Sequence, residues 1–315
     1  MAEIWTMGDL LCEIMRDRED IPLDQTGLFR GPFPSGAPGI FISTVARLGH
    51  SAGVIGGVGK DDFGKVILNR LKNDGVDCTY VKESGGISTG VAFVTYFSDG
   101  ERKFLFHMGN SAAVHAGEPE QEALKGAKYF HIMGCSLTAK PEFAEDIVKV
   151  MHQMKKAGAK VSFDPNLRLE LVQSKEELNI ITEVFREANI FMPGVGELLT
   201  ITGEKDVDAA VEKCFKNPEL ELLVLKKGSK GSTIYSRTGE PVSMGVYPVE
   251  SVDATGAGDS YDGAFISALA EGKTLMEAAK MGAAAGALNT TAFGPMEGNI
   301  SRETVEEMIA RNEKQ

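Results

Sequence analysis

The chain has 315 residues, of which 43% are hydrophobic and 25% are charged, an ordinary composition for a soluble globular protein. Its formal net charge of −12 repels nucleic acids and anionic lipids, which excludes both as partners. We find no basic leader with a long apolar stretch and no run of about eighteen apolar residues, so we expect a cytoplasmic protein without a membrane contact. The cysteines form no CxxC pair and are expected to be reduced thiols.

The first part of the chain predicts a strand, a loop and two helices. Ile4 to Met7 is a short apolar run that indicates a buried strand. The segment 16–39 is polar and then rich in Gly and Pro, which indicates loop or irregular edge structure. Residues 40–48 have helical spacing, and a second helix follows the buried strand AGVIGGVG and ends at Gly75.

Residues 88–107 alternate in polarity around a DG turn, which is typical of a β-hairpin. From about residue 120, strands alternate with helices such as PEFAEDIVKVMHQMKKAG, and this order predicts a parallel sheet covered on both faces. A helical region rich in Ala and Gly spans 257–288 and breaks near Gly272. We predict one α/β domain over 1–315 with a small β lobe; the lobe's segments are about 10–36 and 88–110, and the expected later strands are 129–133, 160–163, 190–192 and 222–225.

The segment DATGAGDSYDGAF, residues 253–265, carries the strongest chemical signal. Gly256, Ala257 and Gly258 are small, so backbone N–H groups at the start of the predicted helix can approach an anion closely. Asp259 lies on the first turn, where its carboxylate can accept the proton of an attacking hydroxyl. An ordinary Gly-rich loop with an N-terminal Asp is the alternative. The strand-like stretch before the turn and the small-residue helix after it favour phosphoryl transfer.

A second glycine turn, LKKGSKG, spans Lys226 to Gly231 between two predicted strands. It suits a loop that faces a nucleotide, although GSKG is also favourable for a plain β-turn. Neither glycine segment matches GxxxxGK[ST], which excludes a P-loop NTPase. No GxGxxG follows the first strand, which argues against a dinucleotide-binding fold.

With these segments in order, nearly the whole chain resembles the PfkB/ribokinase family of carbohydrate kinases. Residues 35–64, SGAPGIFISTVARLGHSAGVIGGVGKDDFG, are similar to the family's N-terminal signature, and DATGAGDSYDGAF is similar to its C-terminal one. FDPNLR, Glu197 and LKKGSKG also fall where the family places them. Two signatures so far apart are much more specific than either one alone.

The resemblance implies a ribokinase-like, Rossmann-type three-layer α/β sandwich with a β-sheet lid over the sugar. It also implies ATP with Mg²⁺, and often a monovalent cation such as K⁺ near the anion hole. Asp259 would be the base and Gly256, Ala257 and Gly258 would hold the transferring phosphate. The nucleotide would lie against Lys226, Gly228, Ser229, Gly231, Gly258 and Asn289. Glu197 would order Mg²⁺. The shell of the monovalent cation would fall at Asp253, Thr255, Asn289, Ala292 and Gly294. Asn289 could equally be an ordinary polar residue at the end of a helix.

Three departures from the family pattern concern the substrate. Family members often have Asn where this chain has Ile40, a second Asn where it has Gly194, and two glycines where it has Ser35-Gly36. One sugar hydrogen bond and one phosphate contact are therefore missing or supplied by other residues.

The candidate substrate-binding residues come from the predicted lobe, from the loop that follows it and from a strand end: Glu13, Gly36, Ala37, Ile40, Arg102, His107 and Arg168. The charges on the lobe could instead serve solubility, and Arg168 could pair with Asp164. Two arginines and a histidine would suit an acidic sugar. Fructose, tagatose and a 2-keto-3-deoxy acid all fit.

Two rival functions stay open at this point: a nucleoside kinase on the same fold, and a sugar- or nucleotide-sensing protein without turnover. The intact GAGD argues against the sensor, which needs no base. The apolar faces of 91–97 and 104–106 could pair across a homodimer or pack on the chain's own substrate.

Overall fold

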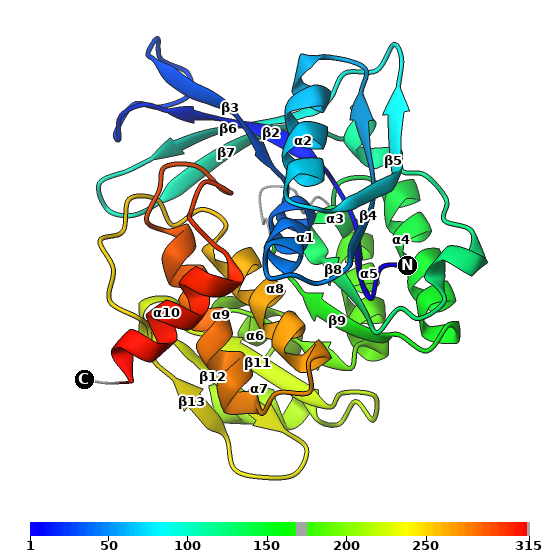
Figure 1. Ribbon diagram of the computed structural model, residues 1–315, viewed down its shortest axis with the longest axis vertical. Helices are drawn as coiled ribbons and strands as arrows, with labels where there is room; N and C mark the ends of the chain where they lie inside the picture. The colour runs from blue at the N-terminus through cyan, green and yellow to red at the C-terminus, as the bar shows by residue number, and fades with distance from the viewer. Residues whose placement is uncertain (168–174, 314–315) are drawn as a thin grey trace.

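The computed structural model describes residues 1–167 and 175–313. The strands of its large sheet are β1 (Ile4–Met7), β4 (Ala52–Gly59), β5 (Asp77–Ser84), β8 (Tyr129–Met133), β9 (Lys160–Asp164), β10 (Ile190–Phe191), β11 (Leu222–Lys226), β12 (Ser232–Ser236) and β13 (Val242–Met244). They lie in the order β13-β12-β11-β10-β9-β8-β1-β4-β5 (Figure 1). Every neighbouring pair from β11 to β5 is parallel, and β12 and β13 are antiparallel. The α/β class is as predicted.

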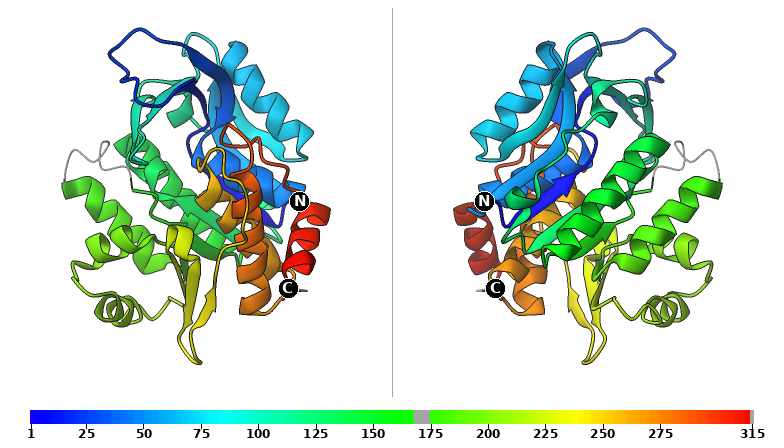
Figure 2. Two further views of the ribbon diagram at one scale, coloured as in Figure 1. Left: turned by 90° about the vertical axis from the view of Figure 1, so that its left-hand side faces the viewer. Right: turned by 90° about the vertical axis from the view of Figure 1, so that its right-hand side faces the viewer.

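Helices cover both faces of this sheet (Figure 2). On one face lie α1 (Ala37–Arg47), α8 (Ala257–Ala270), α9 (Leu275–Asn289) and α10 (Arg302–Asn312), with α2 (Asp62–Asn73) beside β4 and β5. On the other lie α4 (Pro141–Lys156), α5 (Lys175–Glu187), α6 (Val195–Thr202) and α7 (Val207–Cys214), with the short α3 (Gly134–Leu137). Each face of the sheet has its own hydrophobic core, and successive side chains of a strand point to opposite faces. Ile4 belongs to the core on the side of α1 and α8, and Trp5 to the core on the side of α4.

A separate four-stranded sheet, called the lid below, lies beyond the carboxyl end of β1, which leads directly into it (Figure 1). Its strands are β3 (Phe29–Ser35), β2 (Leu11–Arg16), β6 (Gly90–Tyr96) and β7 (Arg102–His107), in that spatial order. The antiparallel pair of β6 and β7 is the expected hairpin. The prediction of a loop over 16–39 was wrong in part, because β3 lies within it. Pro32 and Pro34 are tolerated there since β3 is an edge strand.

The approach to the GAGD turn also differs from the prediction. No strand leads directly into it, because β13 ends at Met244 and residues 245–256 are irregular. Val252 N–H instead donates to the carbonyl oxygen of Thr290 (2.7 Å), which holds this segment against the end of α9. The helical region after the turn does divide into α8 and α9 at Gly272, where φ is +75°.

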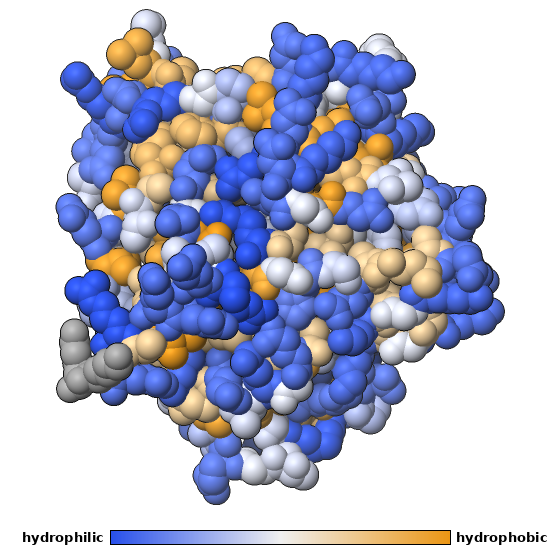
Figure 3. Space-filling model, viewed as in Figure 1, coloured by the Kyte–Doolittle hydropathy of each residue, from blue (hydrophilic) through white to orange (hydrophobic). Residues whose placement is uncertain are grey.

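The four cysteines are free thiols, as predicted. Within the described ranges, no helix is both long and apolar enough to cross a membrane. Hydrophilic residues cover most of the face drawn in Figure 3, in keeping with the charge of −12.

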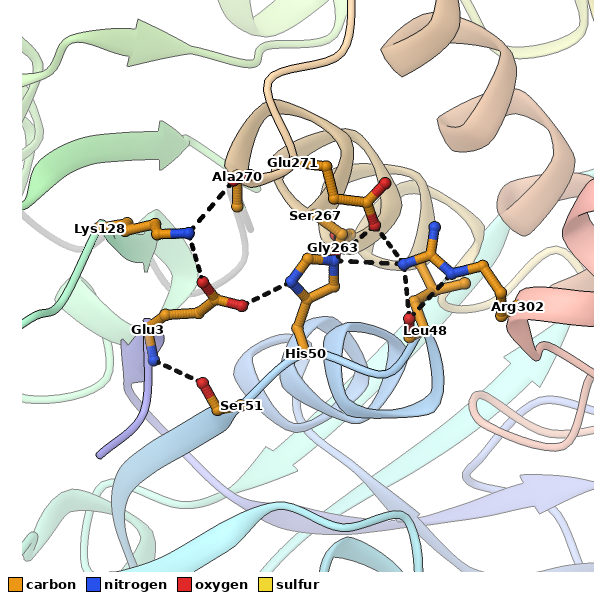
Figure 4. A network of polar contacts seen from close by, with 10 residues as sticks. All are labelled: Glu3, Leu48, His50, Ser51, Lys128, Gly263, Ser267, Ala270, Glu271 and Arg302. Carbon is orange, nitrogen blue, oxygen red and sulfur yellow. Dashed lines mark hydrogen bonds and ion pairs between the residues drawn. The ribbon is translucent and has the colours of Figure 1, made fainter.

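A polar network joins Glu3, just before β1, to segments that are distant in the chain (Figure 4). His50 Nδ1 lies 2.7 Å from Glu3 Oε1, and its Nε2 lies 2.9 Å from Glu271 Oε1. Arg302 also contacts Glu271, and Lys128 Nζ lies 2.7 Å from Glu3 Oε2. These contacts fix β1, the end of α1, the α8–α9 turn and α10 to one another.

Glu271 gives this network a testable pH dependence. Burial alone would raise its pKa, but hydrogen bonds from Arg302 and His50 outweigh burial and lower the pKa below 4.5. Stability from a lowered carboxyl pKa is present above the unfolded value and disappears as the pH falls through the folded value. We expect Glu271→Gln to cost about 1 kcal/mol near neutral pH, since the contacts are partly exposed. Thermal melts should show the difference from wild type shrinking below pH 4.5. A difference that stays constant with pH, or an equal loss in the exposed control Glu240→Gln, would contradict this role.

Candidate active site

Polar side chains converge where the parallel strands end beneath the lid. Asp164 ends β9 and Lys226 ends β11. Glu197 lies on the first turn of α6, shortly after β10, and Asp259 lies on the first turn of α8. Parallel strands end at the same edge of a sheet, which is where α/β folds place ligands.

These residues line a hollow of about 210 Å³, called the inner hollow below. The lid supplies one wall and the strand ends supply the other. Its lining residues are Glu13, Ala37, Ile40, Arg102, Phe104, Asp164, Asn166, Gly194, Glu197, Lys226, Ala254, Thr255, Gly256, Gly258 and Asp259.

A larger hollow of about 570 Å³, called the outer hollow, adjoins the inner one at Arg102, Lys226, Ala254 and Gly258. Small and apolar residues of α8, α9 and the irregular segment 245–256 form much of its wall. Its remaining lining residues are Gly228, Ser229, Gly231, Ser232, Gly245, Val246, Tyr247, Pro248, Val249, Ser251, Ala257, Tyr261, Ala283, Gly286, Ala287 and Thr290.

Asp259 lies at the floor of the inner hollow and is 7% exposed. Its Oδ1 accepts a hydrogen bond from Asn166 Nδ2 at 2.8 Å, so the carboxylate is held in one orientation. The first turn of a helix carries N–H groups without helical partners and a partial positive charge. A carboxylate and an anion-binding helix end therefore face the same small space.

The turn before α8 requires glycine at its centre. Gly256 has φ +79°, and a Cβ there would lie 2.3 Å from the carbonyl oxygen of Pro295. Asn289 Nδ2, at the end of α9, donates to Thr255 O (2.7 Å) and so fixes the turn against α9. The Asp253 carboxylate accepts the N–H of Thr255 at 2.9 Å. The geometry of the anion-facing amides thus depends on buried polar groups behind them.

The residues expected around a monovalent cation gather behind this turn. Asp253 Oδ2 accepts Gly294 N–H at 3.0 Å, in addition to its bond with Thr255. Asn289 is fully buried and lines neither hollow, although it was expected to contact the nucleotide. Ala292 is half-buried two residues before Gly294.

The lid contacts the same turn through Tyr96 of β6. Its hydroxyl donates to Asp253 Oδ1 at 3.0 Å and lies 2.7 Å from Thr255 Oγ1. Arg102 Nη1, from β7, lies 3.5 Å from the same Thr255 oxygen. Burial, together with the charge of Asp253, raises the pKa of Tyr96, so the phenol stays a donor. These bonds set the position of the lid over the inner hollow.

Tyr96→Phe is expected to lower kcat/KM for the sugar that the family resemblance implies, called the acceptor here, by about tenfold. One hydrogen bond to a charged group is worth roughly 1.5–3 kcal/mol. The loss should fall mainly on acceptor KM, since the variant leaves Asp259 in place. Steady-state kinetics with Tyr235→Phe as control would test this, because Tyr235 lies on β12 and lines neither hollow. Unchanged acceptor KM in Tyr96→Phe would contradict the role.

Glu197 is fixed by two backbone donors. Its Oε2 accepts Gly194 N–H (2.6 Å) and its Oε1 accepts Leu167 N–H (2.7 Å). Burial raises the pKa of Glu197, and the nearby charge of Asp164 adds to this. Gly194 itself leaves open space, because a Cβ there would meet only Glu197.

Lys226 is held between two buried carboxyl groups. Its Nζ lies 2.7 Å from Asp164 Oδ2 and 2.9 Å from Asp262 Oδ2. Burial would raise the pKa of Asp164, but the ammonium outweighs burial and lowers it. Burial raises the pKa of Asp262 well above its usual value, and the charge of Asp164 adds to this. Burial would lower the pKa of Lys226, but the two carboxyl groups raise it, so the lysine carries a positive charge.

The expected sugar contacts divide into two groups. Glu13, Ala37, Ile40 and Arg102 line the inner hollow, and Glu13 Oε1 accepts the hydroxyl of Ser35 at 2.7 Å.

Gly36 and His107 are not among the residues that line the inner hollow. Gly36 begins α1 with φ +96°, and a Cβ there would lie 2.3 Å from Asp9 O, so its part is in the backbone. His107 lines a separate hollow with Val91 and Phe93. Alternate residues of a strand point to opposite faces, so His107 lies on the outer face of the lid when Arg102 faces inward.

Arg168 lies outside the described residues. Its alternative partner, Asp164, pairs with Lys226.

Several site residues escaped prediction, namely Asp164, Asn166, Asp262, Tyr96 and Phe104. Asp164 and Asn166 had a readable signal, since they are polar residues at the end of an apolar strand. Asp262 stands one helical turn after Asp259 in the same motif, and neither its residue type nor the family resemblance gave it a role.

Comparison with known proteins agrees with this geometry. The family model described as pfkB family carbohydrate kinase matches residues 36–302. Fructokinase-1 of Oryza sativa subsp. japonica is 37% identical over 300 residues, covering 92% of both chains. Fructokinase-2 of Solanum lycopersicum is 32% identical over 302 residues, covering 92% of this chain and 91% of the other. An E. coli protein assigned as Ribokinase II, with ATP and Mg²⁺ in its crystal structure, superposes with a TM-score of 0.91. It is 36% identical, and the match covers 99% of this chain and 100% of that one.

Proposed function

Since this chain belongs to the pfkB family of carbohydrate kinases, we propose that it transfers the γ-phosphoryl group of ATP to a hydroxyl of a small ketose such as fructose. The observation that carries the proposal is the position of Asp259. Its carboxylate stands at the start of α8, at the floor of a hollow closed by the lid and joined to a larger hollow.

The reaction follows from this arrangement. Asp259 accepts the proton of the sugar hydroxyl as that oxygen attacks the γ-phosphorus, and ADP leaves. N–H groups at the start of α8, around Gly258, stabilise the negative charge that develops on the phosphoryl oxygens. The lid, held by Tyr96, excludes water that would otherwise accept the phosphoryl group.

ATP fits the outer hollow. Gly228, Ser229 and Gly231 line it, and small residues of α9 such as Ala283 and Ala287 provide an apolar wall for a base. The shared wall at Gly258 would place the γ-phosphate between the hollows.

The metal sites differ in how well the chain fits them. Glu197 fits Mg²⁺ held through water, because its oxygens are rigidly oriented at the inner hollow. When bound, Mg²⁺ neutralises phosphate charge. For a monovalent cation, Asn289 Oδ1 is a buried acceptor without a hydrogen-bond partner among the described residues. We propose that this oxygen, together with carbonyl oxygens near Asp253 and Gly294, would hold K⁺.

The residues that line the inner hollow bear on the identity of the sugar that accepts the phosphoryl group. Of the three cations expected near an acidic sugar, Arg102 lines the inner hollow, His107 does not, and Arg168 lies outside the described residues. Glu13 and Asn166 offer hydrogen bonds to neutral hydroxyls. Both fructokinases compared above are named for a neutral ketose. These features favour fructose or tagatose over a 2-keto-3-deoxy acid.

A coupled assay of ADP release with ketoses, aldoses, sugar acids and nucleosides tests the proposal. We expect the highest kcat/KM with a ketose. Higher kcat/KM with adenosine, inosine or cytidine would identify a nucleoside kinase. ATP consumption that no sugar increases would identify a protein without sugar turnover.

We also propose that the outer lid face forms a homodimer. Val91 and Phe93 of β6 lie on this face with Leu105 of β7, which is 48% exposed, and Phe29 of β3 packs edge-on against Phe93. Phe104 and Phe106 stack on the inner face instead, so Leu105 is the residue of 104–106 that could contribute to this dimer face. Analytical ultracentrifugation should show a dimer that Leu105→Glu converts to a monomer. A wild-type monomer at all concentrations would contradict the proposal.

A further inference from the structure

Lys226 occupies the wall between the two hollows. It lines both of them, and its side chain is 17% exposed. Its Nζ lies 3.7 Å from the position that a Cβ on Gly258 would take. The ammonium therefore stands next to the N–H groups at the start of α8, where negative charge is to be stabilised.

The ammonium keeps one donor for a ligand. A lysine has three N–H donors, and two of them point to Asp164 and Asp262. Among the described residues, no third partner of Nζ is found. The two buried carboxyl groups thus hold Lys226 rigidly without using its last N–H.

The backbone places Lys226 beside Gly194. Lys226 N–H donates to Pro193 O at 2.9 Å, and Gly194 forms a parallel bridge with Lys226. Gly194 has no side chain, and a Cβ there would meet only the carboxyl group of Glu197, at 3.2 Å from Oε2 and 3.9 Å from Cδ. Both Gly194 and Lys226 line the inner hollow, so the space beside the ammonium is open to a phosphate.

We infer that Lys226 is a catalytic residue that donates its free N–H to the transferring phosphoryl group. The inference rests on the proposed function and deepens it. The sugar oxygen forms its bond to phosphorus as the bond to the bridging oxygen of ADP breaks, and that oxygen keeps the electron pair. Asp259 takes the hydroxyl proton, and Lys226 keeps its own proton throughout. A fixed positive charge next to Gly258 stabilises the charge that develops in this step.

A purely structural buried ion cluster is the competing explanation, and it predicts a different result. If Lys226 only neutralises Asp164 and Asp262, its removal lowers stability and affects catalysis only through the folded fraction. If Lys226 contacts the phosphoryl group, turnover falls in protein that is fully folded.

The test compares Lys226→Met and Lys226→Arg with the matched control Lys155→Met. Lys155 is also held by two carboxylates, with its Nζ 2.5 Å from Glu187 Oε2 and 3.4 Å from Glu219 Oε2, and it lines neither hollow. We expect Lys226→Met to lower kcat by about 10²- to 10³-fold, the usual loss for one such donor. Its Kd for AMP, which has no γ-phosphate, should stay within about twofold of wild type, and Lys226→Arg should recover part of kcat. Folded Lys155→Met should have the kcat of wild type.

The double variant Lys226→Met with Asp262→Asn covers the case in which the single variant unfolds, because it removes one buried acid together with the cation. Its kcat should remain low at a temperature where circular dichroism shows a native fold. A folded single or double variant with kcat within tenfold of wild type overturns the inference, as does an equal loss of AMP binding. Failure of the proposed function is distinguishable, because wild type itself would then show no sugar-dependent ADP release.

Discussion

Asp259→Asn is expected to lower kcat by about 10³- to 10⁴-fold, because it removes the general base and keeps the shape of the side chain. The amide cannot take the hydroxyl proton, yet Asn166 still has an oxygen to which it can donate. ATP binding should be almost unchanged, since the outer hollow is not lined by Asp259. Steady-state kinetics with fructose, together with ATP titration calorimetry, measures both quantities.

Asp208→Asn is the matched control for that variant. Asp208 is an exposed acid on the first turn of α7, so its replacement removes the same charge from a helix N-terminus far from both hollows. We expect wild-type kinetics. An Asp259→Asn enzyme within tenfold of wild type would refute the base assignment, whatever the control shows.

Gly256→Ala is expected to lower both stability and turnover. A Cβ would lie 2.3 Å from Pro295 O and 3.0 Å from Asn289 Nδ2, so the turn must move. The left-handed backbone alone costs about 1–2 kcal/mol for a residue with a side chain. Displacing the helix start by about 1 Å should lower kcat by roughly a hundredfold or more. Thermal unfolding and kinetics on the folded protein separate the two effects.

Gly272→Ala separates strain from function. Gly272 has φ +75°, nearly the value of Gly256, but nothing lies within 4 Å of the position a Cβ would take. Its replacement should cost the same left-handed conformational energy and leave kcat unchanged. Equal kinetic losses in the two variants would mean that Gly256 acts only through stability.

Most of the fold could be predicted because its signals are local. Apolar runs followed by helical periodicity indicate β/α alternation, and Gly272 marks the end of α8 without any knowledge of tertiary contacts. The edge strand β3 was missed because Pro32 and Pro34 carry the composition of a loop. Only its pairing with β2 makes that segment a strand, and pairing is not encoded locally.

The site was predictable to the extent that its residues lie in one continuous segment. Gly256 to Asp259 form a motif whose chemistry can be read from residue types. The contacts of Tyr96 and Asn166 could not be predicted, because each joins segments distant in the chain. His107 was misplaced because the face of a strand residue depends on register, which alternates at every position.

One measurement tests the central claim most directly. Phosphorus NMR would follow ATP with fructose in the presence of wild-type enzyme and of Asp259→Asn at equal nucleotide occupancy. The proposed mechanism predicts one sugar phosphate for each ADP with wild type, and almost no sugar phosphate with the variant. ADP and inorganic phosphate without a sugar ester in wild type, or an undiminished ester signal with Asp259→Asn, would contradict it.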